Sequence, residues 1–220
     1  MTINIAIDGP AGAGKSTLAK AIAQKLRIHY LDTGAMYRAV AFAALNAGVD
    51  VHSADDVRRM LSQIDLRTAY VGGEQQMLLN GKNVMPFIRT PQISTAASDI
   101  SALPCVREKL VAMQRDVARQ YDLVLDGRDI GTYVLPNAPY KFYVTADAKE
   151  RARRRQAEMA SKGIDKDLQE VLDDILIRDA NDSSRALAPL KKADDAVLID
   201  TTYLSIDEVL DVVLTKFRQE

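Results

Sequence analysis

The sequence of 220 residues contains a single cysteine, Cys105, and no run of 18 apolar residues. One thiol excludes a disulfide framework and favours a reducing compartment. The lack of a long apolar run excludes a transmembrane helix, and the first ten residues, MTINIAIDGP, lack the basic start and cleavage site of a signal peptide. We therefore expect a cytoplasmic protein with no membrane partner.

The sequence also has no excess of charge of one sign, because it contains 29 Lys and Arg residues and 30 Asp and Glu residues, which gives a net charge of −1. This balance argues against a nucleic-acid partner, since nucleic-acid binders carry a basic surface. Apolar residues at 47% and charged residues at 27% are ordinary for a globular chain and exclude disorder. Arg outnumbers Lys by 17 to 12, and a guanidinium can bind phosphate or carboxylate with two bonds.

Short β-rich runs alternate with amphipathic helical patterns along most of the chain. The expected strands cover residues 3–8, 28–31, 123–126, 141–145 and 196–200. This alternation predicts an α/β fold with a five-stranded parallel sheet and helices on both faces. We expect a single domain over 1–220, in which Ser205 and Glu208 form a capping box for the last helix.

Residues 64–100 interrupt the alternation. Short β-prone segments are separated there by Gly72-Gly73 and by Asn80-Gly81, and such dipeptides are typical of tight hairpin turns. The pattern predicts a small antiparallel β insert, with flanking helices at about 54–63 and 90–100.

Residues 9–16, GPAGAGKS, match the phosphate-loop pattern G-x-x-x-x-G-K-[ST] between a predicted strand and a predicted helix. The glycines let backbone N–H groups surround phosphate oxygens, and the helix N-terminus favours the same charge. Lys15 should reach the β and γ phosphates of a nucleoside triphosphate, and Ser16 should offer its hydroxyl to Mg²⁺. A plain glycine-rich turn would leave both residues unexplained. The expected ATP-binding residues are Gly9, Pro10, Ala11, Gly12, Ala13, Gly14, Lys15, Ser16 and Thr17.

A carboxylate, Asp126, ends the apolar run 123–126, where phosphate-loop folds carry a residue for the metal. Ser16 and Asp126 are therefore the expected metal ligands. Arg128 and Asp129 follow at once and should lie in the crevice beyond the carboxyl ends of the strands. A turn with a local Arg–Asp ion pair is the alternative interpretation.

Two further groups carry arginine near the expected strand ends. Thr33 should cap the helix after the second strand, with Arg38 about one turn further, although Arg38 could also be a merely exposed side chain. Arg178, Asp182 and Arg185 would share one face if their helix continued through the weakening run Asn-Asp-Ser-Ser. A solvated ladder of ion pairs is the alternative for this group.

Arg151, Arg154 and Arg155 share one face of another expected helix, and like charges at these spacings repel. A polyanionic ligand would offset the repulsion. Neutralisation of Arg154 by Glu150 and Glu158 is the alternative. Residues 150–168, which include a Ser-Lys-Gly turn, are expected to form a mobile lid.

The motifs GPAGAGKS, LDTGAMYR, LVLDGRDIGT and RDANDSSRALAPL, with the arginine-rich lid, resemble the bacterial cytidylate kinases over nearly the whole chain. Ser16 departs from members that carry Gly there. The resemblance implies a P-loop kinase fold and transfer of the γ-phosphoryl group of ATP to CMP or dCMP, with Mg²⁺ and as a monomer. It also places the insert 64–100 on the side of the acceptor nucleotide.

The resemblance also implies a role for each matching residue. It assigns the acceptor phosphate to Arg38, Arg128 and Arg185, and the ribose to Asp182 and Arg178, with Thr33 near the acceptor. It assigns cytosine to Ser98, Arg107 and Asp129, and a carboxylate can indeed accept from the N4 amino group of cytosine. The implied catalytic set, which stabilises the transferred phosphoryl group, is Lys15, Arg128, Arg151, Arg154 and Arg155.

Three other functions are considered. A nucleoside monophosphate kinase for UMP or dTMP would use the same phosphate contacts. A nucleotide-dependent switch is disfavoured because the guanine-reading pattern Asn-Lys-x-Asp and the pattern Asp-x-x-Gly after the second strand are both absent. A nucleotide-binding structural protein would leave the acceptor-side arginines unexplained.

Overall fold

The structure is a computed structural model that describes residues 2–218, and these residues form two compact units. Unit 1 contains Thr2 and His29–Leu123, and unit 2 contains Ile3–Ile28 and the described chain from Val124 onward. Within the described residues, no helix is both long enough and apolar enough to cross a membrane.

The larger sheet has the strand order β2-β6-β1-β7-β8. These strands are β2 (His29–Asp32), β6 (Leu123–Asp126), β1 (Asn4–Asp8), β7 (Tyr140–Thr145) and β8 (Val197–Asp200). β7 runs parallel to both neighbours, with Ile7 opposite Phe142 and Val144 opposite Ile199. The predicted α/β fold with a five-stranded parallel sheet is therefore confirmed.

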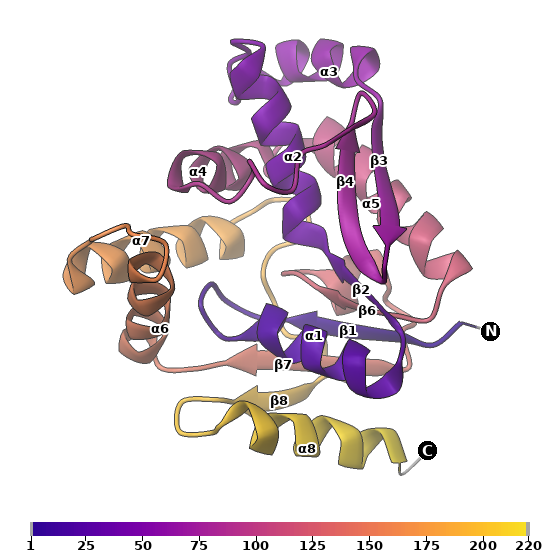
Figure 1. The fold of residues 1–220 in the computed structure, drawn as a ribbon, viewed down its shortest axis with the longest axis vertical. Coiled ribbons are helices and arrows are strands. Elements are labelled where there is room, and N and C mark those ends of the chain that lie inside the picture. The colour runs from indigo at the N-terminus through magenta and orange to yellow at the C-terminus, as the bar shows by residue number, and fades with distance from the viewer. Residues whose placement is uncertain (1, 219–220) are drawn as a thin grey trace. The chain divides into compact units, whose positions relative to one another are not determined.

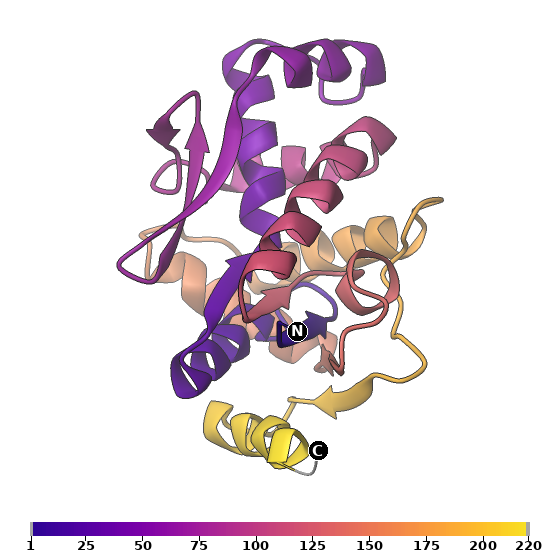
Figure 2. The same cartoon turned by 90° about the vertical axis from the view of Figure 1, so that its right-hand side faces the viewer.

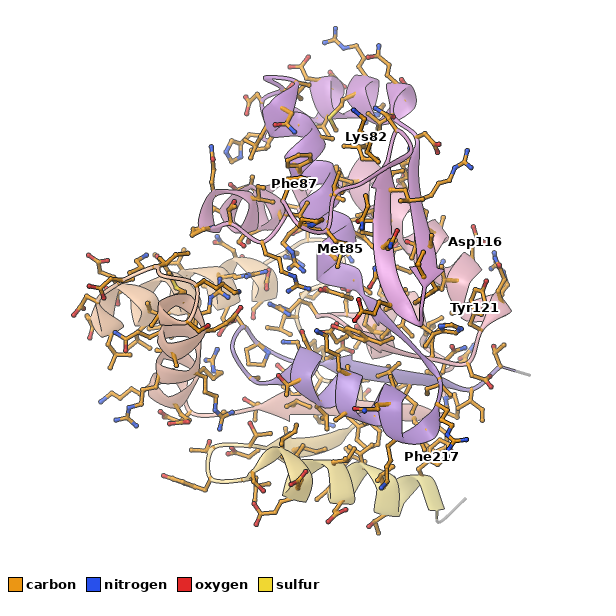
Figure 3. All side chains as sticks on the ribbon, in the orientation of Figure 1. Lys82, Met85, Phe87, Asp116, Tyr121 and Phe217 are labelled. Atoms are coloured by element: carbon orange, nitrogen blue, oxygen red, sulfur yellow. The ribbon has the colours of Figure 1, made fainter. Side chains whose placement is uncertain are left out.

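Helices of unit 2 follow the strands and cover them with apolar side chains. α1 (Lys15–Leu26) follows β1 and packs beside α8 (Ile206–Arg218), as Figure 1 shows. Phe217, labelled in Figure 3, places its ring 4.6 Å from that of Tyr140 on β7. The capping box of α8 is confirmed, because Ser205 and Glu208 exchange backbone-to-side-chain hydrogen bonds.

The second helix pair of unit 2 consists of α6 (Ala148–Ala160) and α7 (Leu168–Ser183), which pack side by side in Figure 1. Their shared apolar cluster contains Ala152, Met159, Val171 and Ile175, and it also contains Ala11 of the phosphate loop. The helix pair is thus joined to the loop by a common core.

Unit 1 combines four helices with a small sheet. The helices are α2 (Thr33–Asn46), α3 (Ala54–Gln63), α4 (Pro91–Ile100) and α5 (Pro104–Gln120), and Figure 2 shows α5 beside α2. The predicted antiparallel insert is confirmed as β3 (Leu66–Val71), β4 (Glu74–Leu79) and a short β5 (Lys82–Asn83). Both predicted turns use positive φ angles, 60° and 83° at Gly72-Gly73 and 50° and 79° at Asn80-Gly81.

Two local predictions were wrong or incomplete. Asp32, not Thr33, caps α2, because its extended backbone lets its carboxylate accept from Ala35 N–H at 2.8 Å. α7 continues to Ser183 and ends before Arg185, so the three polar residues 178, 182 and 185 do not share one helix. The sequence also gave no sign of a short π-helix, η1 (Ile130–Val134), after β6.

Candidate active site

The phosphate loop leaves β1 through Gly9, whose φ of 146° and close approach to β7 admit no side chain. A Cβ atom at Gly9 would lie 1.9 Å from the carbonyl oxygen of Val144. Lys15 at the start of α1 is buried, and its Nζ donates to Pro10 O at 2.6 Å. Burial, together with the nearby Arg128, lowers the pKa of Lys15. The loop therefore holds a lysine that an anion would help to keep charged.

Ser16 and Asp126 meet at the same place, as the sequence led us to expect of a metal-binding pair. Ser16 Oγ donates to Asp126 Oδ2 at 2.6 Å, and Asp126 is buried at the end of β6. Both donors are oxygen atoms, which Mg²⁺ prefers when it binds together with substrate phosphates. The chemistry of this donor set fits Mg²⁺.

Asp182 on α7 gathers two of the predicted acceptor arginines. Arg128 Nε donates to Asp182 Oδ2 at 2.7 Å, and Arg185 Nη2 donates to the other oxygen, Oδ1. Burial alone would raise the pKa of Asp182, but the guanidinium groups of Arg128, Arg185 and Arg178 hold it below its usual value. Arg128 lies two residues after Asp126, which binds Ser16 of the phosphate loop, so this arginine cluster and the loop adjoin within unit 2.

A second buried carboxylate, Asp32, organises the arginines of unit 1. Arg38 Nη2 and Arg89 Nη2 both donate to Asp32 Oδ2, at 2.8 and 2.7 Å. Gln75 on β4 accepts from Asp32 N–H and donates to Asp32 O, which ties the insert to the end of β2. Burial opposes ionisation, yet Arg38 and Arg89 keep the pKa of Asp32 below its usual value. The sequence did not predict the roles of Arg89 and Gln75, because these residues lie 57 and 43 positions from Asp32 along the chain.

Two of the three predicted cytosine-binding residues are buried, and the third, Ser98, is half-buried. Arg107 on α5 is 1% exposed and Asp129 is 5% exposed. A charged side chain that only contacts solvent would be far more exposed. Within residues 2–218, the buried hydroxyl of Ser98 on α4 has no hydrogen-bond partner. Thr33 is buried as well, in the first turn of α2. Buried polar groups in folded proteins normally form hydrogen bonds. These side chains are therefore candidates for binding a ligand.

The lid arginines have different partners. Arg151 is buried and donates to Ala146 O and Ala11 O, at 3.0 and 2.8 Å, so it does not point to solvent as a free lid cation would. Arg154 pairs with Glu150 and also donates to Thr201 O at 2.7 Å. Arg155 pairs with Glu158. The alternative prediction, in which Glu150 and Glu158 both neutralise Arg154, was therefore right for Glu150 only.

Asp8 at the end of β1 orients the segment that follows Asp129. Its two carboxylate oxygens accept from Ile130 N–H and Gly131 N–H, each at 2.7 Å. These two residues begin η1, and a Cβ atom at Gly131 would lie 3.4 Å from Asp8 Oδ2. Burial raises the pKa of Asp8 to about 7. Sequence reasoning missed this residue, because no local pattern marks a bond that spans 122 residues.

Comparison with known proteins gives one consistent family. The family model described as cytidylate kinase matches residues 5–219. A cytidylate kinase of Caldicellulosiruptor saccharolyticus is 50% identical over 98% of this chain and 95% of its own length. A cytidylate kinase of Clostridium botulinum is 44% identical over the whole of both chains. An uncharacterized protein of Eubacterium ventriosum, known from its crystal structure, shares the fold with a TM-score of 0.53 at 13% identity over the whole of both chains.

Proposed function

The chain belongs to the cytidylate kinase family, and from this we propose that it transfers the γ-phosphoryl group of ATP to CMP and dCMP. The products are ADP and CDP or dCDP. The observation that best supports this proposal is the position of Arg128, which follows by two residues the Asp126 that binds Ser16 of the phosphate loop, and which Asp182 holds together with Arg185. A hydrolase or a switch would not need a second set of anion-binding groups beside the loop.

The donor side would bind ATP through the backbone of residues 9–17 and through Lys15. Ser16 and Asp126 would hold Mg²⁺, which neutralises charge on the phosphates when it is bound. Burial and the nearby Arg128 lower the pKa of Lys15, and the triphosphate would favour its charged form by supplying negative charge. Arg154 and Arg155 would turn from Glu150 and Glu158 toward the transferred phosphoryl group when the lid, residues 150–168, closes.

The acceptor phosphate would be bound by Arg38, Arg128 and Arg185. Each now pairs with a buried aspartate, which keeps its guanidinium in place before the substrate arrives. Asp182 and Arg178 would also contact the ribose. No general base is required, since a phosphate monoester oxygen is already ionised at pH 7, so catalysis would consist of positioning and charge stabilisation.

Cytosine would be selected by hydrogen bonds. The Asp129 carboxylate would accept from the N4 amino group, and Arg107 would donate to N3 and O2, with the Ser98 hydroxyl nearby in the base site. Uracil would direct its O4 atom at the Asp129 carboxylate. A buried mismatch of this kind costs about 1–3 kcal/mol for each unpaired group, which is sufficient for discrimination.

The proposal is tested by measuring ADP release from Mg²⁺-ATP with CMP, dCMP, UMP and AMP as separate acceptors. We expect rapid turnover with CMP and dCMP and a kcat/KM for UMP lower by about tenfold to a hundredfold, as expected for one or two mispaired groups. No turnover with any of the four would refute the proposed reaction. Equal rates on CMP and UMP would refute the cytosine contacts alone.

A further inference from the structure

One peptide segment of the phosphate loop is held by side chains from both α6 and α7. Ala11 N–H donates to Asp179 Oδ1 at 2.9 Å, and Ala11 O accepts from Arg151 Nη1 at 2.8 Å. Arg151 and Asp179 are themselves joined by an ion pair. Ala11, Arg151 and Asp179 thus form a closed ring of three hydrogen bonds.

The ring is mostly withdrawn from water. The side chain of Arg151 is 8% exposed and that of Asp179 is 16% exposed. Ala11 packs in the same apolar cluster as the facing sides of α6 and α7. A Cβ atom at the neighbouring Gly12 would lie 3.1 Å from the Cβ atom of Arg151, so the helix touches the loop backbone directly.

The ring determines how two consecutive peptide groups of the loop are oriented. In a trans peptide the carbonyl and the following N–H point in opposite directions. Pro10 O is bound by Lys15 Nζ, and the N–H of the same peptide is bound by Asp179. When Lys15 leaves Pro10 O to bind a phosphate, Asp179 still holds this peptide group. Arg151 likewise holds the carbonyl of the next peptide, which turns the N–H of Gly12 to the opposite side.

We propose that Asp179 is a positioning residue for the donor phosphates, acting directly on Ala11 and indirectly through Arg151. This inference rests on the proposed binding of ATP by the loop, but not on the identity of the acceptor. The carboxylate suits both contacts, because Oδ1 accepts from Ala11 N–H while Oδ2 pairs with the Arg151 guanidinium, whereas an amide has a single acceptor oxygen and no charge.

The variants Asp179→Ala and Asp179→Asn test this role. Asp174→Asn is the matched control, since Asp174 also lies on α7 and forms an ion pair with Lys166. Its side chain is far more exposed than that of Asp179. The measurements are the affinity for Mg²⁺-ATP by equilibrium titration without acceptor, the KM values for ATP and CMP, and the melting temperature. Titration without acceptor keeps the test independent of the acceptor specificity.

We expect Asp179→Ala to weaken ATP binding by about tenfold or more, with the KM for CMP changed less than about twofold. Asp179→Asn should give an intermediate loss, because an amide oxygen still accepts from Ala11 N–H, and it serves alone if Asp179→Ala does not fold. Asp174→Asn should match the wild type. ATP affinity within twofold of wild type in a folded Asp179 variant would overturn the proposal. So would a parallel loss of ATP and CMP affinity that follows the loss in melting temperature, since this would indicate a structural role.

If the wild type binds ATP but does not phosphorylate CMP, the proposed reaction fails while the comparison of ATP affinities still decides the role of Asp179.

Discussion

At the scale of single residues, buried or half-buried carboxylates hold the arginines before any substrate binds. Asp182 joins Arg128 and Arg185, Asp32 joins Arg38 and Arg89, and Asp179 joins Arg151. Pairing removes the rotational freedom that long side chains would otherwise lose when they bind a phosphate. An incoming phosphate would then meet guanidinium groups that are already oriented.

Asp182→Asn should reduce both stability and acceptor binding. The amide cannot balance the charge of two guanidinium groups, and breaking such a buried pair costs roughly 3 kcal/mol or more. We expect kcat/KM for CMP to fall by about 10²-fold, because a misplaced positioning group costs that much. Asp55→Asn, which breaks an exposed pair with Arg58, should leave both quantities nearly unchanged. Steady-state kinetics and thermal unfolding measure the effects, and wild-type kcat/KM in Asp182→Asn would contradict the assigned role.

Asp8 predicts a pH dependence of stability with a definite sign. Its pKa is raised from 3.8 to about 7 by burial and, less strongly, by Asp129, against the opposing effects of two backbone N–H groups and of Lys15. Between these values the unfolded chain has lost a proton that the folded protein keeps, so this carboxyl makes the folded state lose stability as pH rises from about 4 to 7. Above about pH 7 its contribution should level off.

Asp8→Asn tests this sign, because the amide does not titrate. Denaturant unfolding at several pH values between 5 and 8 should show a smaller decline of stability with pH in Asp8→Asn than in the wild type. Parallel curves for the two proteins would show that Asp8 does not titrate in this range.

At the scale of secondary-structure elements, the β insert serves the site by fixing the end of β2. Gln75 on β4 binds both the N–H and the carbonyl of Asp32, at 2.7 and 3.3 Å. Gln75→Ala should therefore loosen Asp32 and its arginines and raise the KM for CMP by about three- to tenfold, with the KM for ATP unchanged. Gln76→Ala is the matched control, since neighbouring strand residues face opposite sides. Equal effects of the two substitutions in kinetic assays would disprove this role of the insert.

Local patterns predicted most elements. Hydrophobic period and turn residues located the strands, the insert and the phosphate loop, because these signals are contained in a few neighbouring residues. η1 escaped prediction, since its start is stabilised by Asp8, 122 residues away in the sequence. The burial of Arg151 escaped it for the same reason: its partners Ala11 and Asp179 lie 140 and 28 residues away. Helical spacing predicted that Arg151, Arg154 and Arg155 share a face, but not which partner each would find.

At the scale of the whole molecule, a net charge of −1 conceals a strong local organisation. In each unit one buried carboxylate lies against two arginines, Asp182 against Arg128 and Arg185 and Asp32 against Arg38 and Arg89, so it offsets part of their positive charge locally. Such a site should attract a phosphate by exchange of partners rather than through a broad positive surface. Family membership and the arrangement of these pairs both favour transfer between two nucleotides over simple hydrolysis of one.

The most direct measurement is the amount of each product formed by the wild-type protein from Mg²⁺-ATP and CMP, separated by chromatography. We predict one CDP for each ADP, and little ADP when CMP is omitted, because the γ-phosphoryl group passes to the acceptor rather than to water. Formation of ADP without matching CDP would contradict the central claim that this chain is a kinase acting on CMP.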